Sequence, residues 1–144
     1  MTTRRGVAPP LTPTAAGPRT PKQRAGERAE QAACEYLIAQ GCSIVARNQR
    51  FREGEIDVIA RDGDCVVFVE VRLRSSARFG GAAASVDAFK QRRLIRAAQH
   101  WLQRTYGDQP QRGRGRAWPA CRFDVITVDA GGISGWIRDA FGAG

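Results

Sequence analysis

Asp57 and Glu70 are the two residues whose type and spacing point most directly to chemistry. They lie in residues 55–61 and 65–73, two segments whose β-branched and aromatic composition predicts β-strands. The Asp62-Gly63 pair between the segments predicts a hairpin with a two-residue loop. The two carboxylates therefore belong to adjacent antiparallel strands, where they could bind one cation together.

The same loop predicts the register of the two strands. With Asp62 and Gly63 as the loop, Asp57 is opposite Phe68 and diagonal to Glu70, about 7 Å away by backbone. Alternate side chains of a strand share a face, so both carboxylates point to one side of the sheet. Carboxylate oxygens suit a hard divalent cation, and Mg²⁺, or Mn²⁺ in its place, is the predicted cofactor.

An alternative is that these acids line a solvent-exposed face and pair with Arg47, Arg50 or Arg72. Exposed pairs of this kind contribute little to stability. The composition of the second strand argues against this alternative, because residues 66–71 are apolar apart from Glu70 and predict a central strand buried on both faces. A buried carboxylate without a partner is costly, so a positive charge is expected beside Glu70.

Two helical segments supply further candidates. In the first, Glu30 borders a stripe of apolar residues that recur at helical spacing. In the second, Lys90 falls inside the apolar stripe and is therefore expected to face the sheet. A lysine at the helix start that extends its ammonium group to solvent explains the position of Lys90 equally well.

Capping and turn signals define the remaining elements. Thr20, Pro21 and Gln23 predict a helix start with a capping box, and Gly41 ends that helix. Ser85 is expected to cap a second helix over residues 86–106. Three more strands are predicted, over residues 43–51, 122–129 and 133–137, with a helical turn after the last. The order αβββαβ plus one strand favours an α/β or α+β fold.

Length, charge and cysteine content bound the class of protein. The 144 residues are enough for one domain, and no apolar run is long enough to span a membrane. The net charge of +9 favours a polyanionic partner such as nucleic acid, although a merely basic protein is the alternative. Four cysteines without a CxxC pair indicate reduced, buried thiols and a cytoplasmic location.

Part of the positive charge lies outside the predicted elements. Residues 1–20 are basic and proline-rich, which predicts a disordered tail ahead of a single domain over residues 21–144. Arg112, Arg114 and Arg116 alternate with glycine, which predicts a mobile basic loop that contacts nucleic-acid phosphates.

Several blocks of sequence resemble one family. The GEID block at residues 54–57, the VFVEVR block at 67–72, the helix around Lys90 and the RFDV block at 122–125 resemble the YraN-type family of predicted bacterial endonucleases. That family is regarded as distantly similar to archaeal Holliday-junction resolvases and, through them, to the PD-(D/E)xK nuclease superfamily. The resemblance implies a restriction-endonuclease-like αβββαβ core, with a central mixed sheet flanked by two helices.

The resemblance also implies site residues. It places Glu30 at the acid of the first helix, Asp57 and Glu70 at the two acids that bind the metal, and Arg72 at the basic position. Superfamily sites usually have lysine where Arg72 stands, and an arginine cannot lose a proton to act as a base. By analogy with the resolvases, the chain is expected to form a homodimer.

Three functions are compatible with the sequence. The first is a Mg²⁺-dependent endonuclease acting on DNA, with branched or structured DNA as a candidate substrate. In it Asp57 and Glu70 bind the metal, Glu30 assists through water, and Arg72 with Lys90 neutralises the scissile phosphate. The second is a non-catalytic nucleic-acid-binding module that retains the nuclease fold, for which Arg72 is the best support. The third, a basic accessory protein of the ribosome or chromosome, explains the charge but not the acids.

Overall fold

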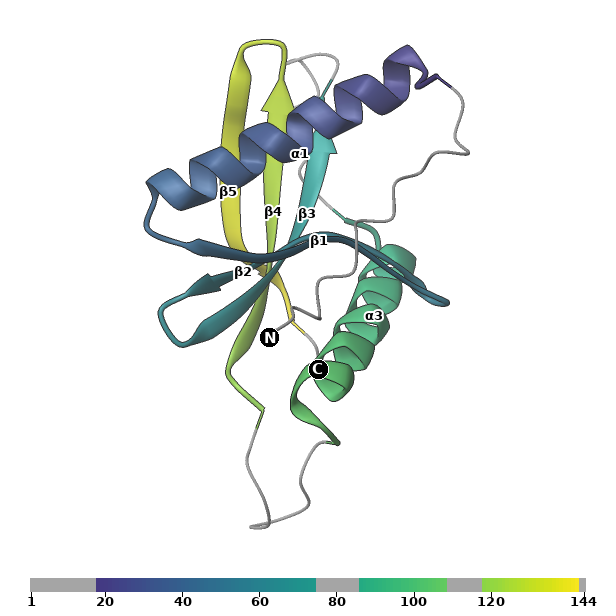
Figure 1. Ribbon diagram of the computed structural model, residues 1–144, viewed down its shortest axis with the longest axis vertical. Coiled ribbons are helices and arrows are strands. Elements are labelled where there is room, and N and C mark those ends of the chain that lie inside the picture. The colour runs from purple at the N-terminus through teal and green to yellow at the C-terminus, as the bar shows by residue number, and fades with distance from the viewer. Residues whose placement is uncertain (1–17, 75–85, 109–117, 143–144) are drawn as a thin grey trace, which may run out of the picture.

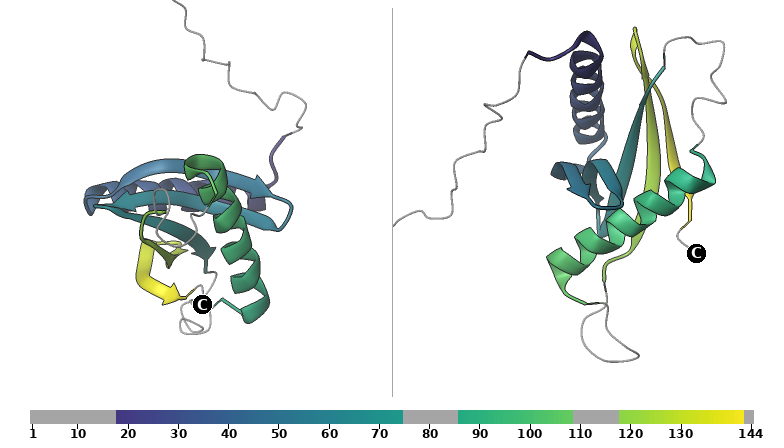
Figure 2. Two further views of the ribbon diagram at one scale, coloured as in Figure 1. Left: turned by 90° about the horizontal axis from the view of Figure 1, so that it is seen from below. Right: turned by 90° about the vertical axis from the view of Figure 1, so that its right-hand side faces the viewer.

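Five strands form one mixed sheet with a helix packed on each face (Figures 1 and 2). The computed structural model describes residues 18–74, 86–108 and 118–142. Along the chain the elements are α1 (Pro21–Ala39), β1 (Ser43–Phe51), β2 (Gly54–Asp62), β3 (Cys65–Leu73), α3 (Ala88–Tyr106), β4 (Cys121–Asp129) and β5 (Gly132–Phe141). The strands lie in this order in the sheet, with β3 and β4 parallel and the other neighbours antiparallel. The predicted α+β fold is confirmed, and the αβββαβ order is consistent with a restriction-endonuclease-like core.

The two helices bury different faces of the sheet, as the right-hand view of Figure 2 shows. Helix α1 packs through Ala29, Ala33 and Leu37 on one face, and α3 packs through Leu94 and Trp101 on the other. The central strand β3 supplies buried side chains to both clusters, as its continuous apolar run predicts.

Helix α1 begins as predicted. The Thr20 hydroxyl accepts a hydrogen bond from the Gln23 backbone N–H at 3.0 Å, and the Gln23 side chain accepts one from the Thr20 N–H at 2.9 Å. Pro21 occupies the first turn, where its missing N–H costs nothing. At the other end Gly41 has φ +97°, a conformation that favours glycine, and the chain turns there into β1.

Strands β2 and β3 form the predicted hairpin, but in a different register. Asp62 lies opposite Cys65, so the two loop residues are Gly63 and Asp64 rather than Asp62 and Gly63. Gly63 has φ +62° and is the first loop residue, the position at which a type II′ turn favours glycine. The pairing therefore differs from the predicted one by two residues. Because side chains alternate with a period of two, every side chain keeps its predicted face.

Helix α3 begins later than predicted. Asp87 is its N-cap, and the Asp87 carboxylate accepts a hydrogen bond from the Lys90 backbone N–H at 2.8 Å. Val86, the predicted first residue, precedes the cap, and its side chain is buried in the core against α3. The predicted cap, Ser85, lies outside the described residues.

The C-terminal segment is one long strand rather than a short strand followed by a helical turn. Strand β5 continues to Phe141, whose ring stacks on Phe123 of β4 with ring centroids 4.9 Å apart. The buried Asp124 carboxylate accepts hydrogen bonds from the Asp139 N–H and the Trp136 indole, both at 2.9 Å. Pairing with β4 thus outweighs the local helical tendency, and Asp124 has a structural role.

The cysteines are free thiols in the structure. Cys34 and Cys42 are buried as predicted, whereas Cys65 is half-buried and Cys121, at the first position of β4, is exposed. Among the described residues, none of the helices has the length and apolar character required to cross a membrane.

Candidate active site

A cavity of about 340 Å³ lies where the N-terminal end of α3 meets β2 and β3. The charged side chains that line it define what is called here the acidic cavity: Glu55, Asp57, Glu70, Asp87, Lys90 and Arg93. Strand pairing brings the two central acids together, since Val58 lies opposite Val69 and the next residue on each strand is Asp57 and Glu70. The structure therefore places both predicted metal ligands in one cavity.

Asp57 marks the point where the two strands separate. Backbone pairing of β2 with β3 is recorded from Asp62 and Cys65 as far as Val58 and Val69. Beyond the pair of Val58 and Val69, the Val71 backbone N–H donates a hydrogen bond to Asp57 Oδ2 at 2.9 Å. The carboxylate thus takes the place of a strand carbonyl as acceptor, which fixes its orientation.

The electrostatic environment of Asp57 is unusually acidic. The pKa of Asp57 is raised from 3.8 to about 8, with burial as the largest cause and the nearby charge of Glu70 as the second. The Val71 N–H has the opposite effect, and more distant Glu30 and Glu55 add to the increase. Asp57 makes no ion pair with any described residue. A cation at this position would relieve the repulsion between the two acids.

Glu70 has positive neighbours. It is 5% exposed, and the Lys90 ammonium lies 3.0 Å from Glu70 Oε2. Arg72, two residues along the same strand face, lies 4.0 Å from the same oxygen. The Lys90 side chain is 47% exposed, so it pairs with Glu70 and still reaches solvent. Both interpretations of Lys90 from the sequence therefore hold in part.

Glu55 shows where the solvent-exposed alternative applies. Its carboxylate lies 3.6 Å from Arg50, and the Arg50 side chain is 81% exposed. This is a surface pair at the rim of the acidic cavity, and it leaves the positions of Asp57 and Glu70 unaffected.

Glu30 does not line the acidic cavity. It lines a separate cavity of about 470 Å³ with Arg47 and Asn48. Burial is the main cause that raises the pKa of Glu30, opposed by the neighbouring Asn48 side chain and the charge of Arg47. Its negative charge nevertheless contributes to the raised pKa of Asp57. Glu30 is thus coupled to the site by its electric field rather than by sharing its space.

Arg93 also lines the acidic cavity, and the sequence analysis did not predict it there. It follows Lys90 by three positions, so both side chains lie on one face of α3, and both line the acidic cavity. This spacing is the signal that could have identified it. Arg112, Arg114 and Arg116, the predicted phosphate contacts, lie outside the described residues.

The donor set of the acidic cavity fits a hard divalent cation that is only partly held by protein. Among the described residues no group of three or more acidic, histidine or cysteine side chains is placed to hold a metal ion. Mg²⁺ is commonly bound through one or two carboxylates, with water and substrate phosphate as the other ligands. Asp57 and Glu70 supply that number of carboxylates, and a bound cation would favour the ionised form of Asp57 over the protonated form that its raised pKa favours.

Comparisons with known proteins identify relatives over most of the chain. Residues 29–128 match the model of the Uncharacterised protein family UPF0102, a span that includes the five site residues predicted on α1, the sheet and α3, and also Arg93. The chain is 50% identical over 121 residues to a UPF0102 protein of Methylobacillus flagellatus, covering 82% of this chain and 96% of that protein. It is 52% identical over 121 residues to a UPF0102 protein of Ralstonia nicotianae, covering 81% of this chain and 85% of that protein. The chain therefore belongs to the UPF0102 family.

Proposed function

We propose that this protein is a metal-dependent endonuclease that hydrolyses phosphodiester bonds in DNA, including branched or structured DNA. The observation that carries the proposal is the pair of carboxylates, Asp57 and Glu70, in a cavity that also contains Lys90 and Arg93. Metal-assisted phosphodiester hydrolysis requires carboxylates that bind a metal ion and positive side chains that bind the phosphate. The acidic cavity contains both. The resemblance of the GEID and VFVEVR blocks to the YraN-type family, itself regarded as distantly similar to PD-(D/E)xK nucleases, supports the same assignment.

Asp57 and Glu70 would hold Mg²⁺ or Mn²⁺. Such an ion would supply polarisation of the scissile phosphate and a nucleophilic water at neutral pH. Lys90 Nζ lies 3.0 Å from Glu70 Oε2, and the Lys90 side chain is 47% exposed. With Glu70 serving as a metal ligand, Lys90 would instead turn to the phosphate.

The positive side chains have separate roles in this proposal. Lys90 and Arg93 lie on one face of α3 and would neutralise the phosphate from the helix side. Arg72, 32% exposed on β3, would stabilise charge in the transition state but cannot act as a base. Glu30 would contribute only through its field and its contact with Asn48, because it lies outside the acidic cavity.

A non-catalytic nucleic-acid-binding module is the second candidate, and one observation favours it. Lys90 and Arg72 both lie within 4.0 Å of Glu70, so this acid is neutralised without a metal. A binder with these pairs would need no ion, and Asp57 would be neutral at physiological pH because its pKa is raised to about 8. The two candidates therefore differ in whether Asp57 and Glu70 matter for an activity or only for stability.

Metal titration with a panel of substrates tests the proposal. Linear, flapped and junction DNA and an RNA of matched length are incubated with Mg²⁺, Mn²⁺ or EDTA. The endonuclease should produce cleaved DNA with either metal and none with EDTA, and Asp57→Asn should abolish the product. Asp64→Asn is the matched control, because Asp64 is an exposed acid in the loop of the same hairpin. Wild-type protein that binds DNA but yields no product with either metal would favour the binding module.

The same proposal includes a partner and a compartment. A homodimer, by analogy with resolvases, would place two acidic cavities on one branched substrate. Four free thiols fit a reducing cytoplasm, where bacterial DNA also lies.

A further inference from the structure

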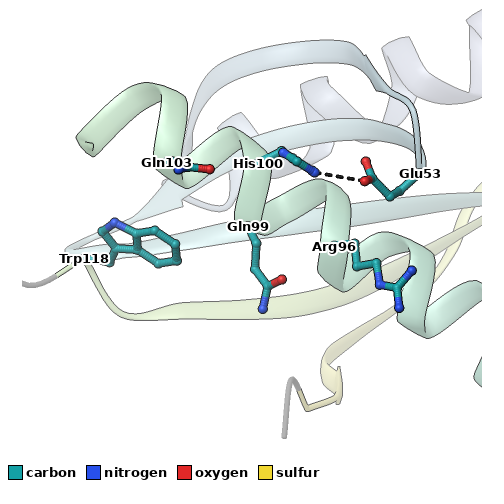
Figure 3. A pocket seen from close by; sticks show the side chains of 6 residues that line it. All are labelled: Glu53, Arg96, Gln99, His100, Gln103 and Trp118. Carbon is teal, nitrogen blue, oxygen red and sulfur yellow. Dashed lines mark hydrogen bonds and ion pairs between the residues drawn. The ribbon is translucent and has the colours of Figure 1, made fainter. Parts of the chain in front are cut away.

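A second cavity of about 520 Å³ lies farther along α3. It is called here the tryptophan cavity and is lined by Glu53, Arg96, Gln99, His100, Gln103 and Trp118 (Figure 3). Trp118 comes from the segment that leads into β4, Glu53 from the β1–β2 turn and the other four from α3. A volume of this size is in the range of small-ligand sites and is large enough for one nucleotide.

The tryptophan cavity adjoins the acidic cavity on two elements. On α3, Arg93 lines the acidic cavity and Arg96 the tryptophan cavity, which places them about 4.5 Å apart along the helix axis. In the β1–β2 turn, Glu53 lines the tryptophan cavity and the next residue, Gly54, lines the acidic one. A ligand in the tryptophan cavity is therefore close to whatever occupies the acidic cavity.

The charge of α3 favours a ligand that carries phosphate. Between Ala88 and Tyr106 the helix has no acidic residue, and its basic residues are Lys90, Arg92, Arg93, Arg96 and Arg104. The one carboxylate that lines the tryptophan cavity, Glu53, is engaged by His100 Nε2 at 2.9 Å (Figure 3). The helix therefore supplies a positive path from one cavity to the other.

The uncharged groups of the tryptophan cavity fit a nucleobase. The Trp118 indole N–H donates to the Gly107 carbonyl at 2.9 Å, which fixes the ring at the cavity wall. Gln99 is exposed, and within the described part of the chain its amide makes no hydrogen bond, so both its donor and its acceptor are available. An indole ring offers a stacking surface for any base, and a glutamine amide can pair with a base edge.

From these contacts we infer that the tryptophan cavity binds one unpaired nucleotide of the DNA whose scissile phosphate occupies the acidic cavity. The base stacks on Trp118 and is hydrogen-bonded by Gln99, while Arg96 contacts a backbone phosphate. This inference rests on the proposed function, and it narrows the substrate class to DNA with an unpaired nucleotide next to the cleavage site. Fully paired duplex cannot present a base in this way without flipping it out.

Binding in EDTA tests the inference without requiring cleavage. Fluorescence anisotropy is measured with three probes of one length: a single-stranded DNA, the same strand with abasic sites in place of its central bases, and the paired duplex. Wild-type protein should bind the base-bearing strand at least about fivefold more tightly than the abasic strand, in line with stacking energies. The Trp118→Ala variant should lose this preference, and Trp118→Phe should retain most of it. Equal affinity of the wild type for the base-bearing and abasic strands would overturn the inference.

Two variants separate the cavity from the overall charge and from folding. Gln99→Ala changes an exposed side chain and should reduce the preference for base-bearing DNA without lowering the melting temperature. Arg96→Ala should weaken binding of both single strands more than Arg92→Ala, which removes the same charge from an exposed position of α3 that does not line this cavity. If Arg92→Ala and Arg96→Ala weaken binding equally, and Gln99→Ala keeps the preference, the cavity is not the binding site.

These outcomes are distinguishable from failure of the proposed function. A base preference that depends on Trp118 in a protein without metal-dependent cleavage would contradict the endonuclease and leave the nucleotide site intact. Metal-dependent cleavage without any base preference would support the endonuclease and contradict the nucleotide site.

Discussion

Lys90 and Glu70 form the closest ion pair of the acidic cavity, with 3.0 Å between Nζ and Oε2. The same ammonium group does not pair with Asp57, which lines the cavity from the neighbouring strand. Of these two acids, Glu70 is therefore neutralised, whereas the ionisation of Asp57 is opposed by burial and by Glu70. Stability, pH dependence and metal binding should all reflect this asymmetry.

The Asp57→Asn variant should be more stable than the wild type near pH 8 in EDTA. Asp57 has a pKa of 3.8 when unfolded and about 8 when folded, so between these values the folded state binds more protons than the unfolded state. The wild type should therefore lose stability as pH rises through this window. Asparagine does not titrate, and urea denaturation from pH 4 to pH 9 should show a smaller decline for the variant. A parallel decline in both proteins would show that Asp57 is not the titrating group.

Lys90→Met should destabilise the protein in EDTA. Removal of the ammonium group leaves a buried carboxylate with only Arg72, 4.0 Å away, as its positive neighbour. A loss of about 1 to 2 kcal/mol is expected, because Lys90 is half-exposed and water screens part of its charge. Urea denaturation measures the loss, and Arg92→Met on the same helix is the control. Saturating Mg²⁺ should recover part of the stability of Lys90→Met, and a metal-independent loss would assign Lys90 a structural role alone.

Arg72→Ala should abolish cleavage with little loss of DNA binding, whereas Arg72→Lys should retain or raise cleavage. The reason is that a fixed positive charge matters most as the transition state forms. Because Lys90 remains at 3.0 Å from Glu70, Arg72→Ala should cost less than about 1 kcal/mol of stability. Thermal melts run beside the cleavage assay separate the effect on cleavage from the effect on stability. A large loss of melting temperature in Arg72→Ala, together with no cleavage by the wild type, would contradict the endonuclease proposal.

The sequence predicted the sheet face of the site residues correctly, but not the exact pairing of β2 with β3. Alternation along β2 and β3 placed Asp57 and Glu70 on one side, and this survived a register error of two residues because the side-chain period is two. The error arose because Gly63 takes the first loop position rather than the second, a choice of turn type that the Asp62-Gly63 pair leaves open.

Other features depend on tertiary contacts that no local pattern contains. Strand β5 extends to Phe141 because Asp124, distant in sequence, binds the Asp139 N–H. Glu30 borders the apolar stripe of α1 as predicted, but it lines a separate cavity with Asn48 of β1 rather than the acidic cavity. Helical spacing could have identified Arg93, whereas the tryptophan cavity joins three separate segments and could not be read from any one of them.

The basic segments should contribute through charge and respond to salt. Replacing Arg112, Arg114 and Arg116 with glutamine should lower the slope of log affinity against log salt by about 2 to 3 if all three contact phosphates. Deletion of the tail should flatten the slope further, and it should end at residue 17 because Thr20 caps α1. An unchanged slope in the triple variant would exclude these arginines from DNA contact.

Binding of Mn²⁺ to metal-free protein, measured by isothermal titration calorimetry at pH 8, tests most directly whether Asp57 and Glu70 form a metal site. The wild type should bind Mn²⁺, with affinity that rises between pH 6 and pH 8 as the proton on Asp57 is lost. Asp57→Asn and Glu70→Gln should each abolish or strongly weaken this binding, while the loop variant Asp64→Asn should bind like the wild type. Equal Mn²⁺ affinity in the wild type, Asp57→Asn and Glu70→Gln would contradict the assignment of these carboxylates as metal ligands.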